Sequence, residues 1–313
     1  MPKCILTNED KEDILSKSDK FTAKQLAEQY GCSRSTILKL WIDNDYHKPL
    51  GFSYYVNDNY FSKIDTANKA YIMGLIASDG NLYKRDNHQG QIRLSFQYGD
   101  SEYNLLENIL MDMNSTHPIQ RNVKTLNEKT FEYIAITIVS QQIFEDLCNM
   151  GITQQKTWLM NIKQVINQIP KQFIRDFLRG YFDGDGSITG ISKNKPSSVS
   201  VNIAMPLQNA KLLQQILHSL GLEAVAQEDN RSNKYSHPFG RFEFFGVNKY
   251  IFLKWIYYEG CLCLQRKYDL ALQYCNLVEN NITNRAENIN TVNQYCTFLK
   301  QNKMIKEEEL DDE

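Results

Sequence analysis

Two aspartates, Asp79 and Asp185, carry the strongest chemical signal in the sequence. Each follows a mostly apolar stretch and is followed by a glycine, Gly80 or Gly186. This pattern predicts two helices that end at the Asp-Gly pairs, with each glycine accepting a positive φ. A helix C-terminus already carries about half a negative charge, so two adjacent aspartates there are electrostatically unfavourable. The pattern therefore indicates that a cation binds between them.

A hard divalent cation with oxygen ligands would suit this arrangement. Few protein groups, completed by water and substrate phosphates, are typical of Mg²⁺. The predicted metal ligands are Asp79 and Asp185, together with Ser78 and Gly184, which directly precede them. An ion that bridges a scissile phosphate would activate water and stabilise the leaving oxygen. One Asp-Gly pair alone would more simply be a polar turn, but two matching copies favour the metal site.

The aspartates belong to a long internal repeat. AYIMGLIASDGNL (70–82) recurs as DFLRGYFDGDGSI (176–188), and LLENIL (105–110) recurs as LLQQIL (212–217). Further along, each copy has a glycine with a lysine a few residues after it. These are Gly151 and Lys156 in the first copy and Gly260 and Lys267 in the second. Because these landmarks recur in one order, the sequence predicts two copies of one fold.

Small residues stand four apart in each repeated helix. They are Gly74 and Ser78 in the first copy and Gly180 and Gly184 in the second. Small residues at this spacing form a flat stripe on one helix face and let two backbones approach closely. We therefore expect the two helices to pack against each other across a pseudo-twofold axis.

Each copy is predicted to run helix, two strands, helix, two strands, helix. QIRLSFQ (91–97) and SVSVNIA (198–204) alternate between polar and apolar residues, as strands with one buried face do. The predicted fold class is α+β, with two pseudo-symmetric αββαββα halves preceded by a small all-α domain. The expected boundaries are 1–50 for the helical domain, 51–68 for a linker, 69–168 and 169–275 for the halves, and 276–313 for a polar, acidic, partly helical tail.

Basic residues lie on the polar faces of these strands and in the adjoining turns. They are Lys84, Arg85, Arg93, Arg121 and Lys124 in the first copy and Lys193, Lys195, Arg231, Lys234 and Arg241 in the second. Alternation by itself is more typical of an ordinary solvated sheet face. Together with these cations, it also fits a saddle that lies on duplex nucleic acid.

The N-terminal segment has the layout of a helix-turn-helix. One helix is predicted over 22–30, a break at Gly31, and a second helix over 33–44 that begins at a serine cap. The second helix of such a motif enters the major groove by its N-terminal end. The residues expected to face DNA are Arg34, Ser35, Thr36 and Lys39. An ordinary helical hairpin has the same layout, but the LAxxYGxSRSTI pattern resembles helix-turn-helix families.

Charge and composition exclude some classes of protein but do not identify the function. The 313-residue chain has a net charge of −2, but six of its last seven residues are acidic, so the remainder is positively charged. Seven cysteines without a CxxC pair argue against a disulfide framework or zinc site and for a reducing compartment. No signal peptide or membrane span is expected. We expect the cytoplasm of a prokaryote or phage-infected cell, with an organellar origin left open.

IMGLIASDG (72–80) and LRGYFDGDG (178–186) resemble the two signature motifs of single-chain LAGLIDADG homing endonucleases. The resemblance covers residues 70–275. It implies sheets that saddle DNA in the major groove and an active site at the ends of the motif helices. It also implies catalytic roles for Asp79, Asp185, Lys156, Lys267 and Gln97, of which Gln97 is matched in one copy alone. The sixth motif position departs between the copies, with Ala77 in the first and Asp183 in the second.

The function that the resemblance implies is site-specific cleavage of both DNA strands, with Mg²⁺ or another divalent cation and short 3′ overhangs. The expected partner is double-stranded DNA, bound by a monomer without membrane association. Two alternatives stay open: a non-catalytic DNA-binding regulator on the same scaffold, and an intron maturase that binds RNA. Retention of both aspartates and both lysines argues against the regulator, and the helix-turn-helix suits duplex DNA better than RNA.

Overall fold

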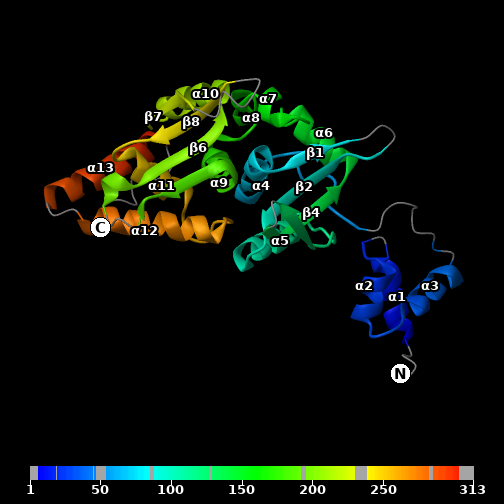
Figure 1. Ribbon diagram of the computed structural model, residues 1–313. Helices are drawn as coiled ribbons and strands as arrows, with labels where there is room; N and C mark the ends of the chain where they lie inside the picture. The colour runs from blue at the N-terminus through cyan, green and yellow to red at the C-terminus, as the bar shows by residue number, and fades with distance from the viewer. Residues whose placement is uncertain are drawn as a thin grey trace.

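The computed structural model describes residues 6–18, 20–44, 46, 54–84, 88–126, 129–191, 195–229, 238–281 and 285–302. These residues form a small helical domain followed by two α+β halves (Figure 1). Several sequence predictions fall outside them, namely those for Arg85, Lys193, Arg231, Lys234, the first part of the linker and the acidic C-terminal segment.

The N-terminal domain consists of three short helices, α1 (Asn8–Lys17), α2 (Ala23–Gln29) and α3 (Arg34–Asp43). The hydroxyl of Thr22 accepts a hydrogen bond from the backbone at the start of α2, and that of Ser33 does so at the start of α3. Such N-caps satisfy backbone donors that a helix leaves unpaired. Between these helices Gly31 has φ +61°, which glycine adopts without strain. A separate apolar cluster holds the domain together; its buried members are Ile14, Ala23, Leu26, Ala27, Ile37, Leu40 and Trp41.

The first half contains one four-stranded antiparallel sheet in the order β1-β2-β4-β3. Its elements are α4 (Ala67–Ser78), β1 (Asn81–Tyr83), β2 (Gln91–Gln97), α5 (Asp100–Asp112), β3 (Gln120–Leu126), β4 (Lys129–Val139), α6 (Gln141–Asn149), α7 (Lys156–Leu159) and α8 (Ile162–Asn167).

The second half repeats this plan with a sheet in the order β5-β6-β8-β7. Its elements are η1 (Lys171–Phe173), α9 (Ile174–Asp185), β5 (Gly186–Thr189), η3 (Pro196–Ser198), β6 (Ser200–Pro206), α10 (Leu207–Ser219), β7 (Ala224–Glu228), β8 (Phe239–Phe244), α11 (Asn248–Ile256), α12 (Gln265–Asn281) and α13 (Arg285–Gln301). The shared element and strand order confirms the predicted fold class.

A single hydrophobic core runs through both halves, centred on α4 and α9. The two helices lie side by side between the sheets (Figure 1). On β2 and β6 the alternate apolar residues are buried, as the sequence pattern predicted. Helix α4 is almost wholly buried, and it needs no amphipathic pattern because neighbours surround it.

The described part of the expected linker is not a linker. Val56, Tyr60, Phe61 and Ile64 are buried in the core of the first half, and the hydroxyl of Tyr60 donates a hydrogen bond to Asp112. The segment was predicted as a linker because its apolar residues follow neither helical nor strand periodicity. An irregular segment can still bury such residues when it lies along a sheet or helix surface.

The expected tail also belongs partly to the fold. Helix α12 continues through the expected boundary at 275/276, and α13 packs back on the second half. Phe298 of α13 is buried, with its ring centroid 5.2 Å from that of Trp255 on α11. None of the helices described above has the length and apolar character that crossing a bilayer requires.

Among the described residues, two hydrogen bonds connect the N-terminal domain to the first half. The hydroxyl of Thr116 donates to the carbonyl of Lys20 at 3.1 Å, and the amide nitrogen of the Gln25 side chain donates to the carbonyl of Thr116 at 3.4 Å. The ammonium of Lys20 also lies 5.6 Å from the ring centroid of Tyr55. The small domain is thus joined to the larger one by polar contacts, while each keeps its own apolar cluster.

Candidate active site

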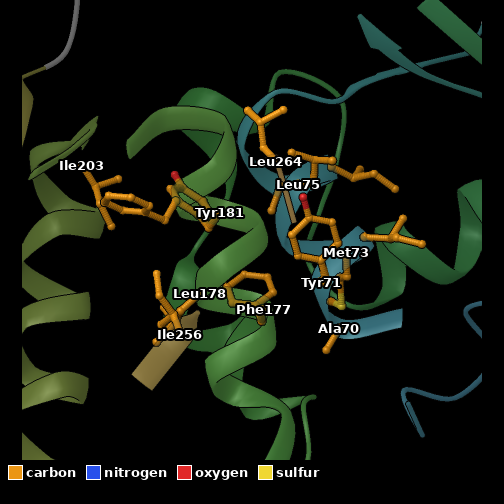
Figure 2. Packing of buried hydrophobic residues seen from close by; sticks show 14 of the residues in the cluster. Ala70, Tyr71, Met73, Leu75, Phe177, Leu178, Tyr181, Ile203, Ile256 and Leu264 are labelled. Atoms are coloured by element: carbon orange, nitrogen blue, oxygen red, sulfur yellow. The ribbon is translucent and has the colours of Figure 1, made fainter. Parts of the chain in front are cut away.

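The stripe of small residues is where the two motif helices meet. A Cβ at Gly74 would lie 2.0 Å from the carbonyl oxygen of Phe177, and one at Gly180 would lie 2.0 Å from that of Tyr71. These distances are far below van der Waals contact, so only glycine allows the backbones to approach this closely. Figure 2 shows Tyr71 and Phe177 on the two facing helices. The contact fixes the helix ends, and the acids that they carry, relative to each other.

The two Asp-Gly pairs end their helices in a different way from the one predicted. Gly186 has φ −80°, and neither it nor Gly80 is among the residues with positive φ. The expectation of a left-handed cap was therefore wrong. Glycine is required for space instead, because a Cβ would lie 2.7 Å from the Ile76 carbonyl oxygen at Gly80 and 2.4 Å from the Phe182 carbonyl oxygen at Gly186. The chain leaves each helix and enters a strand almost at once.

Asp79 and Asp185 lie close together at these helix ends. The carboxyl carbon of Asp79 is 3.3 Å from the position that a Cβ on Gly184 would occupy. Desolvation raises the pKa of Asp79, and desolvation followed by repulsion from Asp79 raises the pKa of Asp185 to about 6. Asp79 is nevertheless exposed and Asp185 half-buried, so solvent can reach both. The two carboxylates therefore repel each other within reach of a ligand.

The donor set at the aspartates fits a hard cation. Within the described ranges, no protein group donates a hydrogen bond to either carboxylate, so their oxygens are available as ligands. The same part of the chain gathers no cluster of three or more His, Cys, Asp or Glu side chains that could hold an ion. A cation at Asp79 and Asp185 would therefore take its other ligands from backbone oxygens, water or substrate. Mg²⁺ is commonly bound in this way.

Lys156 and Lys267 both reach the C-terminal carbonyls of the motif helices. The ammonium of Lys156 donates to the carbonyls of Ala77, at 3.0 Å, and of Ser78. That of Lys267 contacts four carbonyls, those of Phe182, Asp183, Gly184 and Gly186, at 2.7–3.2 Å. Each lysine thereby places a positive charge at a helix C-terminus. This charge offsets much of the repulsion between the aspartates and the negative ends of the two helix dipoles.

The two lysines differ in how fully they are engaged. An ammonium has three N–H donors, so Lys267 uses all of them on the backbone, whereas Lys156 keeps one for another acceptor. Burial lowers the pKa of Lys267 to about 8 and also lowers the pKa of Lys156. The resemblance implied that both lysines act on water or phosphate. The geometry favours that role for Lys156 and a structural role for Lys267.

Asp183, at the sixth motif position, takes part in a buried hydrogen-bond network that sequence analysis did not identify. Its carboxylate accepts from the hydroxyls of Tyr71, at 2.8 Å, and Tyr257, at 2.5 Å, and from the backbone N–H of Leu264, at 2.7 Å. Burial raises its pKa, while these donors stabilise the ionised form. Ala77 has no such group, so the network exists in one half. The sequence signal for this network was the difference between Asp183 and Ala77 at the sixth motif position.

Arg266 is a further cation that sequence analysis did not single out. Its guanidinium donates to the carboxylate of Glu102 at 2.7 Å and thereby links α12 of the second half to α5 of the first. Its positive charge also lowers the pKa of Asp79, against the larger effect of desolvation. Its position directly before Lys267 was the available signal.

The polar faces of the two sheets are mostly neutral. By strand register, Arg93 and Lys124 share the outer face of the first sheet, and Arg241 lies on that of the second, where it donates to Glu243 at 3.2 Å. Amide and hydroxyl side chains occupy most other outer positions: Asn81, Gln91, Ser95, Gln97, Gln120, Asn122, Thr137, Ser187, Thr189, Ser200, Asn202 and Gln227.

Arg121 was wrongly assigned to the outer face. Its partner across the strands is the buried Ile134, so Arg121 points to the same side as the core. There it forms an ion pair with Glu132 at 2.5 Å, and its guanidinium lies 3.9 Å from the ring centroid of Tyr98. Strand β3 shows little apolar alternation, so its register could not be derived from sequence.

Gln97 ends β2 on the outer face of the first sheet, opposite Tyr133. A surface hollow of about 480 Å³ lies beside it, lined also by Arg93, Ser95 and Lys124. The strand registers make Pro206 its counterpart in the second half, so Gln97 is matched in one copy alone. No hydrogen bond joins Gln97 to either aspartate in the part of the chain that the structure describes.

The remaining predicted contacts are accessible. Arg34, Ser35 and Lys39 of α3 are exposed and Thr36 is half-buried, while Lys84 and Lys195 are exposed beside the two sheets. The hydroxyl of Ser33 contacts those of Ser35, at 2.7 Å, and Thr36, at 2.8 Å, at the start of α3. These side chains are placed where a ligand could reach them.

Comparisons with known proteins found one family model and several solved structures similar to parts of this chain. Residues 172–255 match the family model described as the LAGLIDADG-like domain. Among solved structures, the homing endonuclease I-WcaI bound to its DNA recognition sequence aligns with a TM-score of 0.46 and 12% identity, covering 74% of this chain and 92% of that one. I-DmoI in complex with DNA and Ca aligns with a TM-score of 0.42 and 16% identity, covering 70% and 99%. The N-terminal LAGLIDADG domain of DUF199/WhiA aligns with a TM-score of 0.39 and 16% identity, covering 68% and 92%. No curated protein matches the sequence.

Proposed function

Residues 172–255 contain a LAGLIDADG-like domain, and from this premise we propose that the whole chain is a site-specific, double-strand DNA endonuclease of the homing type. The observation that carries the proposal is the pairing of Asp79 and Asp185 at the ends of two helices packed backbone to backbone. Folding stability alone gives no reason to bring two carboxylates together there.

The two sheets would recognise the DNA. Their outer faces present amides and hydroxyls, which can donate to and accept from base edges in the major groove. The outward-facing Arg93, Lys124 and Arg241 could contact phosphates or guanine. Because the two sheets carry different side chains at matching positions, the recognised site would be asymmetric.

The aspartates would hold the divalent cation, for which Mg²⁺ is the expected ion. When bound, it would supply Lewis-acid activation of water and stabilisation of the leaving oxygen. Asp79 and Asp185 would hold this ion at the helix ends, and its binding would relieve their mutual repulsion. Lys156 would donate its remaining N–H to water or phosphate, while Lys267 holds the end of α9 in place.

The N-terminal domain would add contacts to DNA beyond the saddle. Arg34, Ser35 and Lys39 of α3 are exposed, and in a helix-turn-helix the second helix enters the major groove by its N-terminal end. Its own apolar cluster and its polar contacts with the first half suit a separate binding module. It would contribute affinity and site length rather than chemistry.

The test is cleavage of a randomised duplex library with Mg²⁺, followed by sequencing of the cut ends. We expect one asymmetric site, cut on both strands with short 3′ overhangs, and no cleavage by Asp185→Asn. Binding of a preferred duplex without cleavage by the wild-type protein would instead support the non-catalytic regulator. Preferential binding of a structured RNA over every duplex would support the maturase.

A further inference from the structure

A groove of about 710 Å³ lies on the helical side of the second half. Its lining residues belong to α8, η1, α9, α10, α11 and α13 and to the turns beside them. Helix α10 packs against the inner face of the second sheet, with Leu213 and Leu217 in the core. The groove therefore lies on the opposite side of that sheet from the proposed DNA-binding face, and none of the steps proposed above uses it.

One part of the groove is apolar and lies beside the end of α13. Ile216 and Leu220 stand one helical turn apart along α10 and its C-terminal cap, and Ile174 joins them from the start of α9. All three side chains are only partly buried. The side-chain amide of Asn302, the last described residue, donates to the Leu220 carbonyl at 2.9 Å. This hydrogen bond fixes the end of the described chain against the apolar part of the groove.

Two lysines from the connection between the halves also line the groove. Lys163 of α8 and Lys171 of η1 are exposed, and within the described ranges neither ammonium has an ion pair or a hydrogen bond. The backbone N–H of Ile162 donates to the side-chain oxygen of Asn209 at 3.1 Å, so α8 begins beside the first turn of α10. Lys163 thus lies toward the opposite end of α10 from Asn302. No Asp or Glu of the described chain lines the groove.

The sequence that follows Asn302 complements both parts of the groove. Residues 303–313, which lie outside the described part of the chain, read KMIKEEELDDE. Met304 and Ile305 come first, and six acids follow over residues 307–313. At about 3.3 Å per residue, a segment of this length can span about 36 Å. This exceeds the length of α10, which is about 20 Å at 1.5 Å per residue, so the acids can reach both lysines.

We propose that residues 303–313 bind in this groove of their own chain. Met304 and Ile305 pack against the apolar part beside Asn302, and the acids contact Lys163 and Lys171 farther along. The order of apolar and acidic residues in the segment matches the order of the two parts of the groove. Exposed ion pairs are individually weak. The segment is joined to the edge of the groove, however, which gives it an effective concentration there in the millimolar range.

Docking of this segment ties the end of the chain to the connection between the two halves. Lys163 and Lys171 belong to residues 162–173, which lead from the first half into α9. The bound segment stabilises this connection against local unfolding. It also keeps six negative charges on the side of the second half that faces away from the outer sheet face. Neither effect depends on the proposed cleavage of DNA.

The first experiment is zero-length cross-linking of the full-length protein. A carbodiimide joins a carboxylate to an amine that it contacts, so peptide mass spectrometry should find amide links between residues 307–313 and Lys163 or Lys171. Lys211 is exposed on α10 but does not line the groove, and it serves as the internal control. The yield at the groove lysines should exceed that at Lys211 by about tenfold or more. Equal yields at the three lysines, or no link at the groove, would overturn the proposal.

The same assay tests the apolar contact and the identity of the bound chain. Met304→Ser/Ile305→Ser keeps every charge and should lower the yield at the groove, because two apolar side chains no longer hold the segment in place. Ile42→Ser/Met111→Ser is the matched control, since both residues are exposed elsewhere and the yield should not change. An equal mixture of isotope-labelled and unlabelled protein should give links within one copy. Links between labelled and unlabelled copies would show that the segment binds a second molecule and would overturn docking within the chain.

The second experiment measures the coupling between the acids and the lysines by thermal unfolding. Glu307→Gln/Glu308→Gln/Glu309→Gln should lower the melting temperature by about 2 °C in the wild-type background. In the Lys163→Gln/Lys171→Gln background the same change should have no effect, because contacting groups are not additive. The difference should also vanish at about 1 M NaCl, where the Debye length is about 3 Å. An equal loss in both backgrounds would overturn the contact between the acids and the groove lysines.

Discussion

The α-carbon of Gly180 faces the carbonyl oxygen of Tyr71 so closely that a methyl group there would lie 2.0 Å from that oxygen. Gly74 faces the carbonyl of Phe177 at the same distance, so the contact is reciprocal. Backbone atoms cannot move aside as a side chain can. The close backbone approach of α4 and α9 therefore depends on these two positions.

Gly180→Ala should therefore destabilise the protein by about 1–3 kcal/mol or more, because the helices must separate to admit one methyl group. Cleavage should fall with it, since the aspartates are positioned by the same contact. Thermal unfolding followed by circular dichroism measures the change. Gly246→Ala is the matched control, because Gly246 has φ +54° and nothing within 4 Å, so that variant tests the backbone strain alone. Equal losses for the two variants would contradict the steric argument.

Asp79→Asn and Asp185→Asn should each reduce double-strand cleavage by at least about 100-fold, because each removes a carboxylate from the proposed metal site. Binding to DNA should be retained or slightly strengthened, since a negative charge near a polyanion is lost. Cleavage assays and gel-shift titrations measure the two effects. Asp269→Asn, on the exposed side of α12, should leave both unchanged. Full cleavage by Asp185→Asn would rule out a mechanism that needs both acids.

Substitution of Lys267 should mainly lower stability, whereas substitution of Lys156 should mainly lower the cleavage rate. Lys267→Met leaves four helix-end carbonyls without their donor, and we expect a stability loss of about 1–3 kcal/mol. Lys156→Met should cost less stability, because Lys156 is less buried and contacts two carbonyls, yet it should reduce cleavage strongly. Denaturant titrations and single-turnover cleavage rates separate the effects. Equal losses of stability in the two variants would contradict the structural role assigned to Lys267 and the catalytic role assigned to Lys156.

Stability should depend on pH through His117. Its Nε2 accepts a hydrogen bond from the backbone N–H of Val139 at 3.3 Å, which requires a neutral ring, and burial lowers its pKa to about 4. An unfolded chain would protonate this ring near its ordinary pKa of 6.5, so the unfolded state binds the extra proton first as pH falls. The contribution is complete above pH 6.5 and is lost toward pH 4, by about 2 kcal/mol between pH 7 and 5. Thermal melts across this range should show the loss, and His117→Gln should flatten it. A wild-type melting curve that does not change between pH 7 and 5 would contradict this account.

Deletion of residues 1–50 should shorten the DNA footprint on one side of the cut and weaken binding by about 100-fold, because one of two connected binding modules is lost. The cut position should not change at high protein concentration. Arg34→Ala should reproduce part of the loss and lower the salt slope by about one if Arg34 contacts a phosphate. Footprinting and salt titrations measure these effects, with Lys24→Ala of α2 as the control. A truncated protein with the full footprint would show that the domain does not bind DNA.

Sequence reasoning predicted the fold because the repeat supplied every main element twice, and alternation on β2 and β6 fixed their buried faces. It missed the packing of residues 56–64 because buried residues there follow no period. It also placed Arg121 on the wrong face, since β3 is polar on both sides and its register depends on β4. The Asp183 network and the Arg266–Glu102 pair depend on side chains far apart in sequence, so spacing along the chain could not reveal them.

The hydrogen bond from Tyr71 to Asp183 also bears on how the two halves are related by descent. At the facing positions of the repeat, Phe177 corresponds to Tyr71, and Ala77 corresponds to Asp183. A homodimer of the second half would set phenylalanine against each buried aspartate, and a homodimer of the first would leave each buried tyrosine hydroxyl facing alanine. Each half thus carries a side chain that suits the other half at this contact better than it would suit a second copy of itself. If the chain arose by duplication of a self-pairing ancestor, this substitution pair made the fusion irreversible.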